Sequence, residues 1–217
     1  MAPPLSGSVV HTLQRLVGPD HVITDPARLL VYESDGLTAY RTAPRAVVLP
    51  ATTEEVVAVM KLLHAEGIPV VPRGAGTGLS GGALASPGAV ILGTSRMNRI
   101  LSLDPENRLA RLQPGVVNTR LSDAARPHGL YYAPDPSSQT TCTIGGNVAE
   151  NSGGPHCLKY GVTSRYVVGL TVVLADGEVV VLGGAGADPY DGLESLPVGR
   201  VSIVPLIAPP ASTIRWP

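Results

Sequence analysis

The densest cluster of small residues lies at positions 72–82, where the sequence reads PRGAGTGLSGG. Five of these eleven residues are glycine, and they directly follow the apolar run at 68–71. Consecutive small residues after a strand allow backbone N–H groups to converge on an anion without side chains in the way. The pattern therefore predicts that this segment, the glycine loop, binds a phosphate or a diphosphate.

Residues 76–81 also fit the GxGxxG fingerprint of nicotinamide-binding proteins. That fingerprint needs a following helix and an acidic residue about 20 positions later. No full helix can form at 83–85, because Ser86-Pro87-Gly88 interrupts it, and Asp104 falls in an expected loop. Gly82 stands where a Walker A loop requires lysine. A nicotinamide-dependent Rossmann enzyme is therefore the least favoured interpretation, and a Walker A site is excluded.

A second polar segment, residues 134–155, is predicted to be a long loop of hydroxyl, amide and glycine residues. A structureless loop of this length is uncommon in a compact domain unless it has a function. Its side chains offer hydrogen bonds but no nucleophile paired with a base, which favours the binding of a polar, planar cofactor. His156 and His128 are candidate bases, although a structural role is favoured for His128 at its expected helix end.

The composition narrows the class of protein. The chain has 217 residues, of which 44% are hydrophobic, and it has no phenylalanine, so an aliphatic core is expected in one large or two small domains. A net charge of −1 and scattered arginines argue against nucleic-acid binding. Cys142 and Cys157 indicate neither a disulfide scaffold nor a zinc site. The sequence shows no secretory signal and no membrane-spanning run, so a cytoplasmic location is expected.

Hydrophobic periodicity predicts a βαβ unit ahead of the glycine loop. Residues 46–49 and 68–71 are expected strands, and the helix between them starts at the capping box Thr52–Glu55. Strands joined by such a crossover should run parallel. The other expected elements are a helix over 6–16, an irregular stretch over 20–45, strands at 89–92 and 109–112, a helix capped by Asn118, a hairpin of 167–174 with 179–182, and an aperiodic Pro-rich end at 197–217.

Six motifs in combination resemble one family of flavoproteins. They are SDGLTAYR at 34–41, RGAGTGLSGG at 73–82, QPGV at 113–116, YYAPDPSS at 131–138, IGGNVAEN at 144–151 and HCLKYG at 156–161. Together they look like the FAD-binding subunit of glycolate oxidase and the related D-lactate dehydrogenases. These proteins belong to the vanillyl-alcohol-oxidase family, which shares the PCMH-type FAD-binding domain.

The resemblance implies an α+β fold with a PCMH-type FAD-binding domain made of two α/β subdomains. The first is small, contains the βαβ unit and covers 46–83, and the second is a larger mixed sheet that covers 84–192. An N-terminal helical and irregular segment covers 1–45, and a Pro-rich atypical tail covers 193–217. The family continues after this point with a further FAD-contacting loop and a substrate-binding cap domain. Neither is recognisable here, so the chain resembles a C-terminally truncated member.

The family's cofactor contacts carry over to residues of both polar segments. In the family the glycine loop wraps the FAD diphosphate, and the second segment runs along the rest of the cofactor. The matching residues are Arg73, Gly74, Ala75, Gly76, Thr77, Gly78, Leu79, Ser80, Pro134, Asp135, Ser137, Ser138, Thr143, Gly145, Gly146, Glu150, Asn151 and Ser152. Some relatives attach the flavin covalently through a histidine of the glycine loop. Thr77 stands at that position here, so the resemblance implies non-covalent FAD.

The resemblance further implies an FAD-dependent oxidoreductase that transfers hydride from a small 2-hydroxy acid to flavin, as glycolate and D-lactate oxidases and dehydrogenases do. Partners implied are other oxidase subunits, including an electron-transfer subunit, with peripheral membrane association through them. The substrate base belongs to the family's cap domain, so no catalytic residue is assigned, and no metal site is expected. The alternative is a non-catalytic FAD-binding fragment or subunit without the cap.

Overall fold

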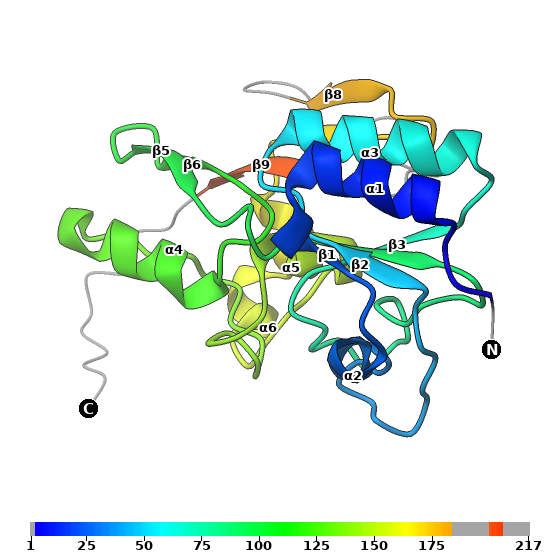
Figure 1. Ribbon diagram of the computed structural model, residues 1–217. Coiled ribbons are helices and arrows are strands. Elements are labelled where there is room, and N and C mark those ends of the chain that lie inside the picture. The colour runs from blue at the N-terminus through cyan, green and yellow to red at the C-terminus, as the bar shows by residue number, and fades with distance from the viewer. Residues whose placement is uncertain (1–2, 184–199, 206–217) are drawn as a thin grey trace.

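The computed structural model describes residues 3–183 and the backbone of residues 200–205. It contains two β-sheets with helices packed around them (Figure 1). The smaller sheet has the order β1 (Val22–Ile23), β2 (Ala46–Val48), β4 (Val90–Gly93), β3 (Val70–Arg73). The larger has the order β5 (Ile100–Asp104), β6 (Leu109–Leu112), β9 (Arg200–Pro205), β7 (Gly169–Val173), β8 (Val179–Gly183). The expected α+β class with two sheets is confirmed, but the mixed sheet is the smaller one, since all described strand pairs of the larger sheet are antiparallel.

Helices cover the smaller sheet on both sides. The α-helices of the described residues are α1 (Gly7–Val17), α2 (Pro26–Leu29), α3 (Thr53–Ala65), α4 (Asn118–Ala125), α5 (Ile144–Glu150) and α6 (Cys157–Tyr160), and 3-10 turns lie at Pro19–His21, Leu30–Tyr32, Arg126–His128 and Thr163–Tyr166. Helices α1 and α3 lie side by side on one face, and α2 lies on the other (Figure 1). None of these helices is long and apolar enough to cross a membrane.

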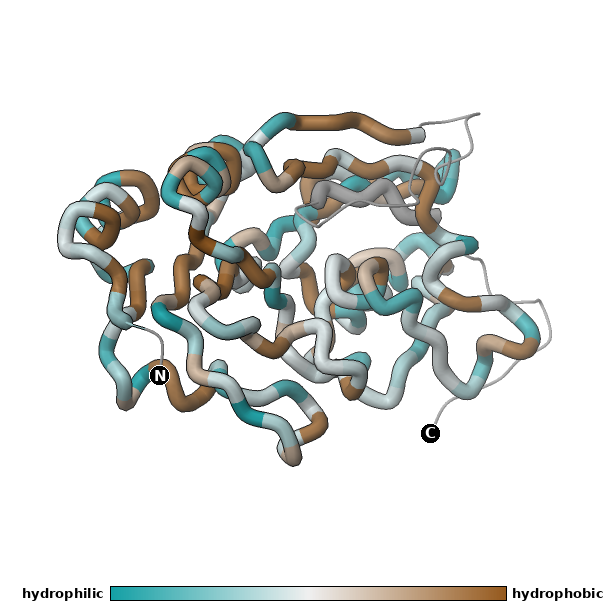
Figure 2. Tube along the Cα trace, turned by 90° about the vertical axis from the view of Figure 1, so that its right-hand side faces the viewer, coloured by the Kyte–Doolittle hydropathy of each residue, from teal (hydrophilic) through white to brown (hydrophobic). Residues whose placement is uncertain are grey.

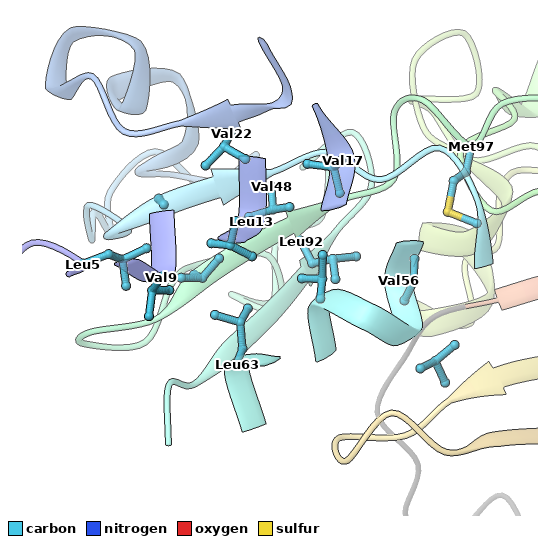
Figure 3. Packing of buried hydrophobic residues seen from close by; sticks show 14 residues of the cluster. Leu5, Val9, Leu13, Val17, Val22, Val48, Val56, Leu63, Leu92 and Met97 are labelled. Carbon is cyan, nitrogen blue, oxygen red and sulfur yellow. The ribbon is translucent and has the colours of Figure 1, made fainter. Parts of the chain in front are cut away.

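The apolar stripes of α1 and α3 form the main core with the smaller sheet (Figure 3). Leu13 of α1 and Leu63 of α3 are fully buried together with Leu92 of β4. The neighbouring Ile91 points to the opposite face, where it packs with Leu29 of α2. Each such side chain contributes about 1.5–3 kcal/mol when fully buried. This core fixes β3, the strand from which the glycine loop starts.

The βαβ prediction is confirmed. Strands β2 and β3 both pair in parallel with β4, so they are parallel to each other with β4 between them. Helix α3 starts as expected, because Thr52 Oγ1 accepts the N–H of Glu55, 3.2 Å away, and the Glu55 carboxylate accepts the N–H of Ala51. Strand β4 was expected to belong to the second subdomain (84–192), but its hydrogen bonds place it in the smaller sheet. All its residues are buried, as a central parallel strand requires.

The aperiodic, Pro-rich residues 197–217 were not expected to form a regular element, and this expectation is wrong for part of that segment. Residues 200–205 form β9, which pairs antiparallel with β6 on one side and β7 on the other. Two neighbouring strands satisfy its backbone groups, and this pairing outweighs the lack of any period in the sequence. Pro205 lies at the last position of β9, where a missing N–H disturbs the ladder least. The rest of the predicted tail (193–217) lies outside the described residues.

The hairpin predicted at 167–182 is confirmed by the antiparallel pairing of β7 with β8. Strand β8 forms one edge of the larger sheet, and Figure 2 shows it as a hydrophobic stretch on the outside of the molecule. Its side chains alternate between exposed and half-buried. This alternation is the pattern of a strand with one covered face.

The prediction that 134–155 is a structureless loop is wrong in its second half. Residues 144–150 form α5, which Thr143 caps by accepting the N–H of Gly146 at 3.4 Å. Adjacent glycines lower helix propensity, so no helical pattern is visible in the sequence. The N–H of Gly145 donates to the carbonyl of Pro114, 2.8 Å away, and this contact with a distant segment fixes the first turn.

Two smaller expectations also need correction. Asn118 does not cap its helix, because it is the first residue of α4 and its side-chain N–H donates to the carbonyl of Pro134 at 3.0 Å. Residues 20–45 are not wholly irregular, since they contain β1 and α2. Asp25 caps α2 by accepting the N–H of Ala27 at 3.1 Å. The Asn118 bond joins residues 16 positions apart and the Asp25 cap is local, but hydrophobic periodicity reveals neither.

Candidate functional site

A cleft of about 360 Å³ lies between the glycine loop and the start of α5. The glycine loop leaves the end of β3, and α5 presents its first turn from the opposite side. The structure thus brings together the two segments that the sequence predicted to hold one ligand. Predicted site residues that line the cleft are Arg73, Gly74, Ala75, Gly76, Thr77, Gly78, Leu79, Ser138, Thr143, Gly145, Gly146, Glu150 and Ser152.

Five predicted site residues do not line this cleft: Ser80, Pro134, Asp135, Ser137 and Asn151. Three of them have structural partners instead. The carbonyl of Pro134 accepts from Asn118, the carboxylate of Asp135 pairs with His156, and the side-chain oxygen of Asn151 accepts the N–H of Ser164 at 2.9 Å. A cofactor role for these five stays a prediction.

The backbone of the glycine loop offers free donors to the cleft. In the described part of the chain, no hydrogen bond uses the N–H groups of residues 74–80. Four of these residues, Gly74 and 76–78, are half-buried. Because no other group of the described chain uses these N–H groups, they can donate to the acceptors of a ligand in the cleft. With small side chains around them, they are suited to a phosphate or diphosphate, as the sequence predicted.

The two walls of the cleft approach so closely that they require glycine. A Cβ atom at Gly74 would collide with the Thr143 hydroxyl. A Cβ atom at Gly145 would lie 2.5 Å from Cβ of Pro114 and 2.9 Å from its carbonyl oxygen. A side chain at Gly74 would therefore press against Thr143 of the other wall, and one at Gly145 would push α5 away from the backbone of Pro114.

The cleft is lined by one positively charged and one negatively charged side chain among the described residues. Among the described residues that line it, Arg73 is the one basic side chain and Glu150 the one acidic side chain. Arg73 is 8% exposed, and its guanidinium donates to the carbonyl of Ala83 at 3.1 Å and stacks over Tyr32 at 5.7 Å. Burial lowers the pKa of Arg73, yet the group stays charged because its ordinary value is so high. Anion preference therefore comes from Arg73 together with the free backbone donors.

The back of the cleft contains polar residues that the sequence did not single out as site residues. Asn147 is 2% exposed and, within the described residues, its side-chain Nδ2 has no hydrogen-bond partner. Cys142 lies beside it, and burial raises the pKa of its thiol, so it stays protonated at neutral pH. Neither residue follows a spacing that could have marked it. Other lining residues outside the prediction are Pro72, Gly82, Ala83, Thr94, Pro114 and Ala149.

Neither candidate histidine lines the cleft. The ring Nδ1 of His156 pairs with Oδ2 of Asp135, and its backbone N–H donates to Oδ1 of the same residue at 3.4 Å. This double contact ties the turn before α6 to the 134–138 segment. His128 ends a 3-10 turn after α4. Within the described residues, no group of three or more His, Cys, Asp or Glu could hold a metal.

Comparison with known proteins identifies the class of this domain. Residues 44–183 match the family described as FAD binding domain. This match covers more than half of the chain, which therefore belongs to that family of FAD-binding domains. The free N–H groups, the buried Arg73 and the glycine-lined walls fit the diphosphate-bearing cofactor for which the family is named.

Curated relatives narrow the resemblance further. The chain is 50% identical over 181 residues to the glycolate oxidase subunit GlcD of Escherichia coli (strain K12), which covers 83% of this chain and 36% of that protein. It is 42% identical over 179 residues to the D-lactate dehydrogenase of Anaerostipes hadrus, which covers 79% of this chain and 38% of that protein. The predicted resemblance is confirmed, and the chain spans less than half the length of these relatives.

Solved structures share the fold at lower identity. Alkyldihydroxyacetonephosphate synthase superposes with a TM-score of 0.85 at 22% identity, over 97% of this chain and 42% of that one. Substrate-bound p-cresol methylhydroxylase superposes with a TM-score of 0.77 at 23% identity, over 94% of this chain and 44% of that one. At such identities the two structures establish the fold alone.

Proposed function

We propose that the chain is the FAD-binding part of a flavin oxidoreductase that oxidises a small 2-hydroxy acid. The observation that carries the proposal is the cleft with its unpaired N–H groups. It lies in a domain that is 50% identical in sequence to a glycolate oxidase subunit. A D-lactate dehydrogenase among the relatives points to the same substrate class. FAD, when bound, would supply the hydride acceptor.

Each wall of the cleft has a separate task in this proposal. The N–H groups of residues 74–80 and the Arg73 guanidinium hold the diphosphate by charge-assisted hydrogen bonds. The first turn of α5 brings Thr143 and the amide of Asn147 to the same cleft, where they orient the polar parts of the cofactor. We further propose that FAD is held without a covalent bond, since Thr77 stands where some relatives have histidine.

The visible spectrum of the purified chain tests this proposal. Flavin absorption bands should be present, and they should fade when glycolate or D-lactate is added without oxygen. Acetate and propionate, which lack the hydroxyl that is oxidised, serve as matched controls and should leave the bands unchanged. A colourless protein that takes up no added FAD would contradict cofactor binding itself.

A second candidate is an FAD-binding part without substrate chemistry of its own. The lining of the cleft favours it, because among the described residues there Glu150 is the one carboxylate and no histidine or lysine is present to take the hydroxyl proton. In that case the same spectrum should show flavin bands that no 2-hydroxy acid bleaches.

Partners and location follow as part of the proposal. A relative named as an oxidase subunit supports association with other oxidase subunits. We propose that one of these subunits transfers electrons. Co-purification with those subunits from a native source would test it. A cytoplasmic location, with peripheral membrane association through the partners, stays a prediction that cell fractionation can check.

A further inference from the structure

A segment outside the family match contacts the glycine loop directly. Residues 33–37 precede the matched range of 44–183. The N–H of Gly36 donates to the carbonyl of Gly78 at 2.9 Å. A Cβ atom at Gly36 would lie 2.7 Å from the carbonyl oxygen of Thr77 and 2.9 Å from that of Gly78. The two backbones therefore touch, and no side chain fits between them.

Asp35 connects this segment to the far end of the glycine loop. Its Oδ1 accepts the N–H of Leu37 at 2.8 Å, and its Oδ2 accepts the N–H of Gly81, 46 positions along the chain, at 2.9 Å. The residue is 6% exposed. A buried carboxylate is costly unless hydrogen bonds and a nearby cation compensate it. Here two N–H donors compensate it, and the Arg73 guanidinium is close enough for the Asp35 charge to oppose the lowering of the Arg73 pKa.

Arg73 holds the other end of the loop. It begins the loop at the end of β3 and donates to the carbonyl of Ala83 at 3.1 Å, so the loop is closed at its base. Gly81 lies between Arg73 and Ala83 along the chain, and its N–H donates to Asp35, which lies outside the loop. The N–H groups of residues 74–80 remain unpaired between these two fixed points.

We propose that Asp35 is a positioning residue for FAD binding. It holds Gly81 and thereby keeps the free N–H groups of the glycine loop directed at the diphosphate. This inference rests on the proposed function, since it takes FAD as the ligand of the loop. It extends the cofactor site to a segment that the family match does not include.

Two substitutions of Asp35 test the hydrogen bonds that its carboxylate accepts. Asp35→Ala removes both acceptors and leaves the N–H groups of Leu37 and Gly81 without partners. Asp35→Asn keeps the shape and one carbonyl oxygen, so it retains one of the two bonds. Asp25→Ala is the matched control, because Asp25 also accepts a backbone N–H, that of Ala27, but caps α2 away from the cleft.

The test is titration of FAD-free protein with FAD, followed by flavin fluorescence, alongside urea unfolding of the same FAD-free proteins. The Kd for FAD should rise about ten- to hundredfold in Asp35→Ala and by a smaller factor in Asp35→Asn. Asp25→Ala should leave the Kd at the wild-type value. If Asp35→Ala does not fold, the isosteric Asp35→Asn decides the matter alone.

Three results would overturn the inference. If Asp35→Asn lowers the urea midpoint but binds FAD as wild type does, the role of Asp35 is structural only. If wild type itself binds no FAD, the proposed function fails, and this inference fails with it. Wild-type binding together with unchanged Kd values in the Asp35 variants would reject the positioning role and leave the proposed function intact.

Discussion

The two walls of the cleft acquire their structures for different reasons. The glycine loop follows the partly buried edge strand β3 and forms no helix, as expected from its closely spaced glycines and from Ser86-Pro87-Gly88. Residues 144–150 also contain adjacent glycines, yet they form α5. Thr143 caps that helix, and Pro114 accepts the N–H of Gly145. Local composition accounts for the absence of a helix in the first wall, whereas a helix forms in the second with the help of a contact to a distant segment.

The largest effect is expected from a change at the contact that shapes the second wall. In Gly145→Ala the new Cβ atom would lie 2.5 Å from Cβ of Pro114, so the backbone of α5 must shift. We expect the free energy of unfolding to fall by about 1–3 kcal/mol, as overpacking does, and FAD retention to be lost. Urea unfolding and the flavin content of the purified protein measure the two quantities.

Gly7→Ala is the matched control for this experiment. Gly7 lies in the first turn of α1, and a Cβ atom there meets nothing within 4 Å. Its stability and flavin content should equal or exceed those of wild type. Equal behaviour of the two variants would show that the contact with Pro114 does not decide α5.

The next effect concerns the first wall. Gly76 has a φ of +72°, and a Cβ atom there would collide with the Arg73 guanidinium. Gly76→Val should therefore distort the glycine loop and sharply reduce FAD retention, because a β-branched residue rarely adopts positive φ. Flavin content and the Kd for FAD are the measurements.

Gly67→Val is the control that separates the effect of backbone strain from the loss of FAD contacts in the glycine loop. Gly67 has a φ of +61°, but no atom lies within 4 Å of its Cβ position, and it does not line the cleft. Both variants should lose about 1–2 kcal/mol of stability from the left-handed conformation. Only Gly76→Val should lose FAD, and equal FAD binding by the two would reject the role of the glycine loop.

A smaller effect is expected from the helix cap of the second wall. Thr143→Ala removes the acceptor for the N–H of Gly146, and Thr52→Ala removes the equivalent cap of α3. Each should lower the free energy of unfolding by about 1 kcal/mol. The Kd for FAD should rise in Thr143→Ala and stay constant in Thr52→Ala. A rise in both would mean that the two walls respond to global stability alone.

The smallest effect is expected at Thr77. Acid precipitation of the flavin-loaded protein should leave the yellow colour in the supernatant, because threonine forms no covalent bond to the flavin. Thr77→Ala should keep FAD nearly as tightly as wild type, since the backbone N–H of residue 77 remains. Colour that stays with the precipitate would contradict non-covalent binding.

The predictions from sequence succeeded where a pattern is local. The capping box of Thr52 and Glu55, the apolar period of α3 and the hairpin of β7 with β8 each depend on residues close along the chain. They failed where the partner is distant. Strand β9 exists because β6 and β7 pair with it, and no feature of its own residues predicted a strand.

Local patterns likewise predicted only part of the candidate site. The glycine loop was identified from its composition, and most of its residues line the cleft. Asn147 and Asp35 were missed as site residues, because a buried amide or carboxylate carries no spacing signal. Asp35 is one of several scattered acids near the N-terminus, and only the fold brings it to Gly81.

The sequence by itself determined that a strand would end in a loop of small residues, because closely spaced glycines disfavour a helix and permit such a loop. Its motifs also determined the family to which the domain belongs. Only the tertiary structure decided what faces this loop: a helix capped by Thr143, a buried amide and a carboxylate that holds the loop from an upstream segment. The physical reason is that hydrogen bonds and close packing between distant residues depend on the folded backbone, which local patterns do not encode.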